Sequence, residues 1–337
     1  MKPLHVAILG STGAVGQEFL RLLDERRFPL ASLRLLASKK SAGKQEVFRG
    51  KPITIEEARP DSFEGLDLVL SSAGGSISKE LVPHAVKAGA LVVDNTSAYR
   101  MDPSVPLVIP EINPECIQKH QGIIANPNCS TIIMLVPIFP LHQISKIKRI
   151  VVSTYQAVSG AGQKAMDELR QQTEEILAGK KNFTKNIFPY QVAFNLFSHN
   201  TRINEEGFCE EEVKMIRETH KILNNDSIQV FPTTIRVPVF RAHSESILID
   251  QEKPLSLEAV RSALKKAPGV KMIDDRENNY FPMPAEAEGQ DAVLVGRLRK
   301  DPSSEGSLGL FVSGDQIRKG AALNAVQIAE IWNQSRS

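Results

Sequence analysis

The chain of 337 residues carries 41 basic and 39 acidic side chains, so its formal net charge is only +2. This balance gives no electrostatic argument for nucleic acid as the main partner. The content of 42% hydrophobic and 24% charged residues is typical of a globular protein, and the length indicates roughly two domains. The three cysteines lack CxxC or Cys/His spacing, which argues against a disulfide framework or a zinc site and favours a reducing compartment.

The N-terminus enters a β-rich segment, residues 4–9, whose apolar stretch is too short for a signal peptide. No run of the sequence approaches the length of a membrane span. We therefore expect a cytoplasmic protein with small-molecule ligands and with no metal, membrane or nucleic-acid partner.

Three glycines follow the first strand, Gly10, Gly13 and Gly16, and an amphipathic helix follows them. A strand, a Gly-rich turn and a helix form the context of a dinucleotide fingerprint, in which the pyrophosphate lies on the helix N-terminus. The spacing GxxGxxG differs from the usual GxGxxG, and an ordinary Gly-rich turn is the alternative. The position directly after an N-terminal strand favours the dinucleotide site.

The end of the second predicted strand, residues 32–37, indicates which dinucleotide is bound. An NAD site usually carries an acidic residue there for the ribose 2′-hydroxyl. This chain has Ser38, Lys39 and Lys40 instead. A cationic, hydroxyl-bearing loop suits a 2′-phosphate and predicts NADP, although a solvated basic loop is the common alternative.

Strand and helix patterns then alternate up to residue 129. Strands are expected within 66–75, 90–100, 105–113 and 122–125, with a helix at 78–89, as in a parallel sheet with crossover helices. Ligand-binding residues of such sheets follow the carboxyl ends of the strands. Arg100 and Cys129 both occupy such positions.

Cys129 follows the turn Asn126-Pro127-Asn128 and precedes an apolar run that we expect to end at Pro137. It therefore falls near the first turn of a helix, where orphan N–H groups and the helix dipole lower a thiol pKa. The alternative is a buried structural thiol, which on this stretch alone is the more frequent case.

The pattern of predicted strands and helices changes from about residue 147, in the second half of the chain. A strand with a glycine loop, a long polar helix at 162–179 and a helix at 210–223 precede an alternating region, 228–251, that predicts paired strands. A helix at 255–267 and strands at 292–300 and 308–315 follow. This order predicts an α+β sheet with helices on one side, and the last helix, 321–332, is expected to pack on the first domain.

Three residues of this half complete a possible mechanism around Cys129. His243 follows Arg236 by seven residues, and Gln156 ends the first strand of the domain. Each alone is more often structural or solvated. Together with a helix-terminal cysteine and a nicotinamide site they fit one chemistry, in which a thiolate attacks a carbonyl carbon.

The whole chain resembles the aspartate-β-semialdehyde dehydrogenase family. The motifs that carry the resemblance are, in order, GSTGAVGQ, SAGK, DNTSAYRM, NPNCST, TYQAVSGAG, FPYQVAFN, EEEVKMIRET, RVPVFRAHS and RKGAALNAVQIAE. The chain departs from the family at Lys40, where arginine is frequent, at residues 198–201, and at Gln316, where asparagine is common.

The resemblance implies a Rossmann-type NADP-binding domain, residues 1–127 with the helix at about 317–337, and an α+β catalytic and dimerisation domain, residues 128–316. It implies the NADP- and phosphate-dependent interconversion of L-aspartate 4-semialdehyde and L-aspartyl 4-phosphate by a homodimer. This step belongs to the biosynthesis of lysine and diaminopimelate, threonine, methionine and isoleucine.

The resemblance also assigns residue roles. Cys129 forms the thioester, His243 takes the proton as a general base and Gln156 orients the acyl group. Arg236 and Glu211 hold the substrate carboxylate and ammonium, and Arg100 and Lys214 hold phosphate. The cofactor contacts are implied for Gly10, Thr12, Gly13, Ala14, Val15, Ser38, Lys40, Ser41, Ser159, Gly160 and Gln316.

Two alternatives remain at this stage. N-acetyl-glutamyl-phosphate reductase shares the fold plan and the thioester chemistry, but its substrate has an acylated nitrogen, for which the carboxylate of Glu211 is poorly suited. A non-catalytic NADP-binding regulatory protein would not need Cys129, Gln156, Arg236 and His243 together.

Overall fold

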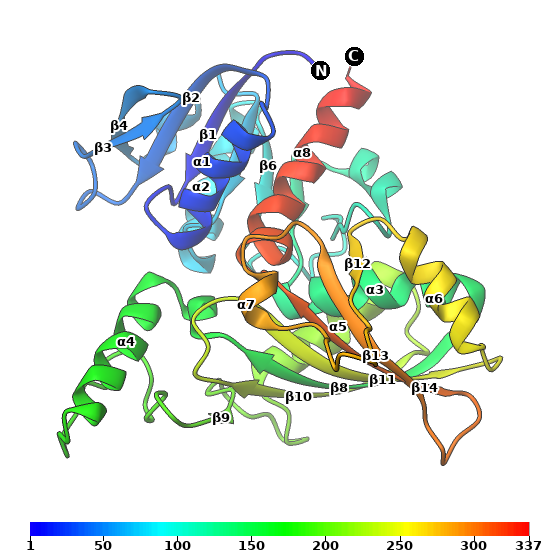
Figure 1. Cartoon of the computed structure of the whole chain (residues 1–337). Coiled ribbons are helices and arrows are strands. Elements are labelled where there is room, and N and C mark those ends of the chain that lie inside the picture. Colours follow the sequence, from blue (N-terminus) through cyan, green and yellow to red (C-terminus); the bar gives the residue numbers. More distant parts are fainter. Residues whose placement is uncertain (337) are drawn as a thin grey trace. The chain divides into compact units, whose positions relative to one another are not determined.

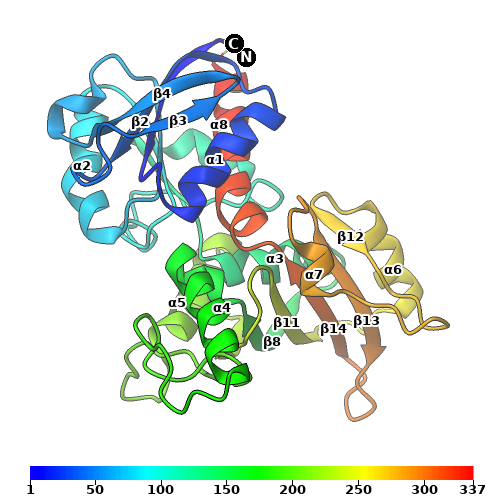
Figure 2. The same ribbon diagram turned by 60° about the vertical axis from the view of Figure 1, so that its left-hand side comes forward.

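The structure is a computed structural model that describes residues 1–336 and divides into two compact units. Unit 1 contains residues 1–128 and the C-terminal segment that begins at residue 321, whereas unit 2 contains residues 129–320. In Figures 1 and 2 unit 1 is the blue-to-cyan part with the red helix α8, and unit 2 is the rest of the chain. Each unit has its own sheet and its own core.

The sheet of unit 1 has the strand order β3-β4-β2-β1-β5-β6-β7. All neighbouring strands are parallel except β3, which forms an antiparallel hairpin with β4. The strands are β1 (Leu4–Leu9), β2 (Leu30–Ala37), β3 (Gln45–Phe48), β4 (Lys51–Glu57), β5 (Leu68–Ser71), β6 (Leu91–Asp94) and β7 (Ile123–Ala125). The helices are α1 (Ala14–Glu25), α2 (Gly75–Lys87) and α8 (Leu323–Ser335), with 3-10 turns at Pro60–Phe63 and Pro114–Lys119.

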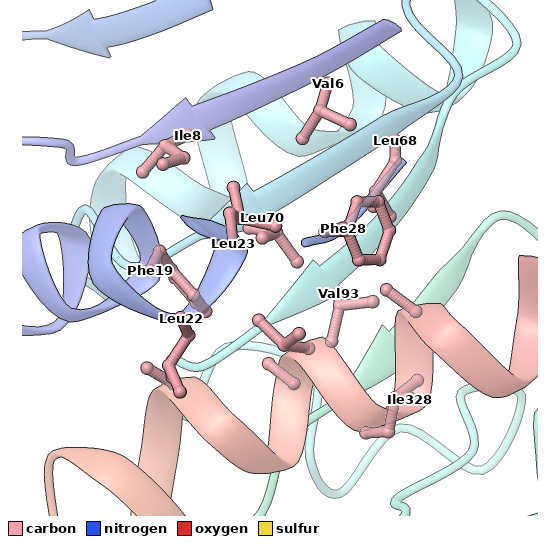
Figure 3. Packing of buried hydrophobic residues seen from close by; sticks show 14 of the residues in the cluster. Val6, Ile8, Phe19, Leu22, Leu23, Phe28, Leu68, Leu70, Val93 and Ile328 are labelled. Atoms are coloured by element: carbon pink, nitrogen blue, oxygen red, sulfur yellow. The ribbon is translucent and has the colours of Figure 1, made fainter. Parts of the chain in front are cut away.

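The alternation of side chains along β1 explains why both faces of this sheet are covered. Val6 and Ile8 point to one face, where they pack with Phe19 of α1 and Ile328 of α8 (Figure 3). Ala7 and Leu9 belong to a second buried cluster that contains Leu81 and Val82 of α2. A parallel sheet buried on both faces needs such continuous apolar strands. Helix α8 belongs to unit 1 and packs in this cluster, and the α/β class with a Rossmann-type unit is confirmed.

Two details of unit 1 correct the sequence prediction. Residues 105–113 form no strand among the described residues, and only an isolated bridge joins Leu107 to Ala125. The side chain of Asn113 binds the backbone there, accepting from Ile109 N–H and donating to Leu107 C=O, each at 2.9 Å. Pro106 and Pro110 also remove two backbone donors. In addition, the sequence analysis did not predict the hairpin of β3 and β4, which follows β2 in the chain.

The sheet of unit 2 has the strand order β12-β13-β14-β11-β8-β10-β9. Its strands are β8 (Ile147–Gln156), β9 (Phe197–Ser198), β10 (Gln229–Arg236), β11 (His243–Gln251), β12 (Val270–Met272), β13 (Val293–Lys300) and β14 (Ser307–Gly314). Its helices are α3 (Cys129–Ile144), α4 (Gln163–Leu177), α5 (Glu210–Leu223), α6 (Leu257–Lys266) and α7 (Pro284–Ala287), with a 3-10 turn at Val158–Ala161 and a π-turn at Arg318–Ala322. Helices α3 and α5 lie on one face of this mixed sheet (Figure 1).

The position of β8 corrects the expectation for residues 228–251. β10 and β11 are not paired with each other, because β8 lies between them, parallel to β10 and antiparallel to β11. This arrangement places Arg236, at the end of β10, directly opposite Gln156, at the end of β8. His243 begins β11 beside the same end of β8.

Helix α3 also runs further than its sequence indicates. It begins at Cys129 and continues through Pro137 and Pro140 to Ile144, so Pro137 interrupts the apolar run without ending the helix. Nearly every side chain from Ser130 to Ile138 is buried. Burial all round the helix stabilises it enough to offset the backbone hydrogen bonds that the two prolines remove.

Candidate active site

The candidate active site of unit 2 lies where three strand ends meet the first turn of α3. Gln156, Arg236 and His243 are at the ends of β8, β10 and β11, and all three are almost fully buried. Cys129 starts α3 and is half-buried. The structure therefore brings together the four residues that the sequence had selected from separate segments.

Cys129 occupies the helix terminus that the sequence predicted. A Cβ placed on Gly320 would lie only 2.9 Å from the Cβ of Cys129, so the chain at residue 320 passes directly beside the cysteine. The next residue, Ser130, is buried and accepts a hydrogen bond from Nε2 of Gln156 at 2.9 Å. The first turn of α3 is thus fixed to the end of β8. A thiolate at this position faces the positive end of the helix dipole.

The amide of Gln156 connects α3 with α5. Besides its bond to Ser130, Nε2 donates to Oε1 of Glu211 at 3.3 Å. Its Oε1 is buried and has no hydrogen-bond partner among the described residues. A buried amide oxygen without a partner is costly in a protein that binds nothing there. It is therefore placed to interact with a ligand.

His243 is held by a backbone amide. The N–H of Ala157 donates to Nδ1 of His243 at 3.1 Å. Since Nδ1 accepts, the neutral ring carries its proton on Nε2. Burial lowers the pKa of His243 well below its ordinary value, Arg236 and His199 lower it further, and Glu211 acts in the opposite direction. The neutral ring thus offers an N–H donor at Nε2 and no free lone pair. This geometry favours a hydrogen-bond donor at Nε2, and the role of general base that the resemblance assigns to His243 stays a prediction.

The guanidinium of Arg236 is buried and pre-oriented. Nη1 donates to the carbonyl of Ala157 at 2.5 Å, and Nη2 contacts Nε2 of His199 at 3.1 Å. Its Nε has no hydrogen-bond partner among the described residues. Burial lowers the pKa of Arg236, whereas Glu211 and Cys129 raise it, which places the guanidinium within electrostatic reach of both groups. A fork of this kind suits a carboxylate.

Glu211 and Lys214 lie on one face of α5. The carboxylate of Glu211 is buried and accepts from Nζ of Lys214 at 3.1 Å. Lys214 remains partly exposed, with 31% of its side chain accessible. This pair offers a buried anion next to an accessible cation, as expected for one group that holds an ammonium and another that holds phosphate.

The glycine loop after β8 packs against His243 and Arg236. A Cβ on Gly160 would lie 3.3 Å from Nη1 of Arg236 and 3.5 Å from Nε2 of His243. Nε2 of Gln316 donates to the hydroxyl of Ser159, and Oε1 of Gln316 accepts from Ala242 N–H at 2.8 Å. Ser159 and Gln316 are both buried. The predicted cofactor residue Gln316 therefore braces this loop.

Unit 1 contains a separate cavity of about 390 Å³ at the Gly-rich turn. Gly10 adopts φ +89°, and a Cβ there would collide with the backbone of Ser72, so glycine is required. Helix α1 begins after Gly13 with no side-chain cap and no acidic residue in its first turn. Its free N–H groups and the cavity fit a dinucleotide phosphate.

The predicted cofactor residues of unit 1 divide into two groups. Those that line this cavity are Gly10, Thr12, Gly13 and Ser38. Those that do not are Ala14, Val15, Lys40 and Ser41; the first two begin α1, Lys40 is exposed, and Ser41 donates its N–H to Ser38 C=O at 2.8 Å. Arg59, Ile77 and Glu80 also line the cavity and were not selected from the sequence.

Arg100 belongs to unit 1 and is buried. Its Nε donates to Asn126 C=O at 2.9 Å and its Nη2 to Asn95 C=O at 2.8 Å. It thereby ties together the segments that follow β6 and β7, at the carboxyl ends of those strands, as expected.

Three contributors to the unit 2 site were missed by sequence reasoning. The backbone of Ala157 holds both His243 and Arg236, and a peptide group has no sequence signal. His199 contacts Arg236 because β9 pairs with the end of β10. Ser130 could have been selected, since it follows the cysteine directly.

The cysteines and the rest of the chain offer few competing sites. Cys209 is buried at the N-cap of α5, and burial raises the pKa of the Cys116 thiol. Within residues 1–336 no cysteine forms a disulfide, and no group of three or more His, Cys, Asp or Glu side chains is arranged to hold a metal ion. Across the same residues, every helix is too short or too polar to span a membrane.

Comparison with known proteins assigns both parts of the chain. Residues 5–120 match the family described as semialdehyde dehydrogenase, NAD binding domain, and residues 138–319 match semialdehyde dehydrogenase, dimerisation domain. The aspartate-semialdehyde dehydrogenase of Synechocystis sp. is 57% identical over 329 residues, which is 98% of this chain and 97% of that protein. The enzyme of the same name from Aquifex aeolicus is 52% identical over 97% of each chain.

Solved structures of the same family also match this chain. The crystal structure of aspartate semialdehyde dehydrogenase II complexed with ASA from Vibrio cholerae has a TM-score of 0.96 and 43% identity, and the match covers 99% of both chains. The aspartate semialdehyde dehydrogenase with NADP from Candida albicans has a TM-score of 0.77 and 25% identity over 98% of both chains.

Proposed function

This chain belongs to the aspartate-semialdehyde dehydrogenase family, and we propose that it interconverts L-aspartate 4-semialdehyde and L-aspartyl 4-phosphate through a thioester on Cys129. The observation that carries the proposal is the position of Cys129 at the start of α3, beside the converging ends of β8, β10 and β11. The family assignment replaces the two alternatives left open by the sequence, since every relative reported above carries the same enzyme name.

The residues of unit 2 divide the reaction between them. The thiolate of Cys129 attacks the aldehyde carbon, and the carbonyl oxygen becomes an alkoxide. Nε2–H of His243 donates to this oxygen and stabilises its charge in a water-poor site. A bound nicotinamide cofactor supplies hydride transfer to and from the substrate carbon. Attack by phosphate on the thioester then expels the Cys129 thiolate and yields the acyl phosphate.

Substrate binding follows from the charges around Cys129. Arg236 holds the α-carboxylate through its fork, and the carboxylate of Glu211 attracts the α-ammonium. Lys214 offers a cation for phosphate in unit 2, and the family resemblance assigns Arg100 of unit 1 to phosphate as well. Gln156 orients the acyl group with its amide, whose Oε1 has no other partner among the described residues. Ser159 and Gly160 would line the nicotinamide pocket, as the family resemblance implies.

For the cofactor we propose NADP in preference to NAD. The segment after β2 begins with Ser38, which lines the cavity, and continues with exposed Lys39 and Lys40 instead of an acid. The ratio of kcat/KM values for NADP+ and NAD+ tests this proposal. Lys40→Glu should lower that ratio, and equal use of both cofactors by the unaltered enzyme would contradict it.

The partner is a second copy of the chain, in agreement with the dimerisation domain at residues 138–319. The face of the unit 2 sheet opposite α3 and α5 carries Tyr155, Phe231 and Phe311, and Phe231 is 52% exposed. An apolar sheet face of this kind is suited to pack against the same face of a second copy of the chain.

The sharpest test uses phosphate as a switch. Without phosphate, enzyme, NADP+ and semialdehyde should give a rapid burst of NADPH of at most about one equivalent per active site, because the thioester accumulates. The acyl adduct should be found on Cys129 by peptide mass spectrometry, and added phosphate should restore turnover. Cys129→Ala should lose the burst, whereas the matched variant Cys116→Ala should keep it. Full turnover without phosphate, or an adduct on Cys116 or Cys209, would contradict the mechanism.

A further inference from the structure

The cavity of unit 1 contains a cation that the cofactor fingerprint does not include. Arg59 is the basic residue among the described residues that line it, and it shares the lining with Gly10, Gly13 and Ser38. Lys39 and Lys40, the cations expected from the sequence, are exposed and do not line the cavity. The residue that faces a bound nucleotide from this wall is therefore Arg59.

The strand register explains how Arg59 reaches this place. β4 runs parallel to β2, with Glu57 opposite Ala37, the last residue of β2. The N–H of Ala58 donates to the carbonyl of Ala37 at 2.8 Å and extends the pairing by one residue. Arg59 consequently leaves the sheet edge beside Ser38. In a Rossmann-type unit this edge is where the 2′-position of the adenosine ribose lies.

Local contacts fix Arg59 in position. Its N–H donates to Oγ of Ser62 at 2.9 Å, and the N–H of Ser62 donates back to its carbonyl at 3.0 Å. Its Nε and Nη2 both donate to Oε2 of Glu57, at 3.0 and 2.5 Å. These bonds use one edge of the guanidinium and leave Nη1 able to donate to a ligand. An exposed ion pair of this kind contributes little to the free energy of unfolding. Replacing Arg59 should therefore not destabilise the fold.

The guanidinium of Arg59 offers this wall an anion-binding group, although carboxylates lie nearby. Glu57 is engaged with Arg59, and Glu80 also lines the cavity. Asp61 also acts electrostatically on Arg59, so these three carboxylates stand against three positive charges, on Arg59, Lys39 and Lys40. A planar guanidinium binds phosphate oxygens in a bidentate manner, which an ammonium cannot do.

We propose that Arg59 recognises the 2′-phosphate of NADP(H) and is the main determinant of cofactor preference in this chain. The inference rests on the proposed NADP dependence and adds the residue that reads the phosphate. Lys39 and Lys40 provide the surrounding positive potential, and Glu57 orients the fork.

The test compares ligands that differ only in the 2′-phosphate. Dissociation constants of NADP+, NAD+, 2′,5′-ADP and 5′-AMP are measured by calorimetry on the full-length enzyme. Arg59→Ala should weaken NADP+ and 2′,5′-ADP by roughly ten- to a hundredfold, the loss expected for charged hydrogen bonds, and should leave NAD+ and 5′-AMP within about twofold. Arg59→Lys should lie between, since it keeps the charge without the fork.

The control is Lys51→Ala, which removes the same charge at the other end of β4. It should leave all four constants unchanged. If Arg59→Ala weakens NAD+ as much as NADP+, and 5′-AMP as much as 2′,5′-ADP, then Arg59 stacks on the adenine and the proposal is wrong. The proposal is also wrong if Arg59→Ala weakens none of the four ligands. If the unaltered enzyme binds NADP+ no more tightly than NAD+, the proposed cofactor itself is wrong, whatever the variants do.

Discussion

The backbone N–H of Ala157 donates to Nδ1 of His243, and this bond determines which ring nitrogen carries the proton. A peptide N–H cannot accept, so Nδ1 must, and the neutral ring presents Nε2–H to the site. The carbonyl of the same Ala157 accepts from Arg236. The backbone of one residue, through its two adjacent peptide groups, thus orients the donor for the substrate oxygen and the fork for the substrate carboxylate. A movement of the loop at Ala157 would therefore displace both the imidazole of His243 and the guanidinium of Arg236.

His243 should therefore act as a hydrogen-bond donor. His243→Leu should lower kcat by roughly 10²–10³-fold, the usual cost of one oxyanion donor. His243→Gln keeps an N–H donor without a titrating ring and should retain clearly more activity. Because the pKa of His243 is lowered, the ring stays neutral down to pH values well below its ordinary range, so the kcat profile should lack a limb near pH 6.5 from this residue. A glutamine variant as inactive as the leucine variant would indicate proton transfer instead.

Substrate binding by Arg236 should depend on the planar shape of its guanidinium as well as on its charge. Its two terminal nitrogens already bond to Ala157 C=O and to His199, and the single nitrogen of a lysine cannot reproduce this planar arrangement. Arg236→Lys should lower kcat/KM for the semialdehyde by roughly ten- to a hundredfold, in line with lost charged hydrogen bonds. The dissociation constant of NADP+ should not change. If steady-state kinetics of this variant match the parent, the substrate carboxylate binds elsewhere.

The sequence predicted the parts of the site that carry a side-chain signal. Cys129, Gln156, Arg236 and His243 were selected because their types fit one mechanism. Their convergence was not predictable, since it depends on β8 lying between β10 and β11, which an alternating pattern cannot specify. The role of Ala157 could not be predicted at all, because its backbone performs it.

The errors of prediction have similar physical causes. Residues 105–113 have the composition of a strand, yet the side chain of Asn113 takes the backbone bonds that a neighbouring strand would make. Pro137 has the local signal of a helix end, but burial on all sides outweighs it. Arg59 could have been found, because a basic residue just after the strand that pairs with β2 must lie next to the loop at Ser38.

Gly160 should tolerate no side chain without loss of activity. A Cβ there would approach Nη1 of Arg236 and Nε2 of His243 to 3.3 and 3.5 Å, and the first of these contacts is tight for such atoms. Gly160→Ala should therefore crowd the substrate oxygen and carboxylate, with a loss of roughly tenfold in kcat/KM and an unchanged melting temperature. Stopped-flow burst amplitudes would separate slow acylation from lost sites. A variant with unaltered kinetics would show that substrate does not pass between Gly160 and His243.

Glu245 should make the enzyme less stable as pH rises. It lies in β11, two residues after His243, is fully buried, and neither carboxylate oxygen has a hydrogen-bond partner among the described residues. Burial raises the pKa of Glu245 well above its ordinary value of 4.5, so the folded protein keeps a proton that the unfolded chain releases above that pH. The unfolded state then binds fewer protons, and the free energy of unfolding falls with pH by up to about 1.4 kcal/mol per unit until the folded pKa is reached. Glu245→Gln has nearly the same shape and no charge to release. It should remove this part of the pH dependence and raise the free energy of unfolding at pH 8, measured by urea denaturation at pH 5.5 and 8 at one fixed protein concentration. The matched variant Glu64→Gln, at an exposed position, should keep the parent slope. If Glu245→Gln keeps the parent pH dependence of the free energy of unfolding, Glu245 is ionised in the folded protein and the prediction is wrong.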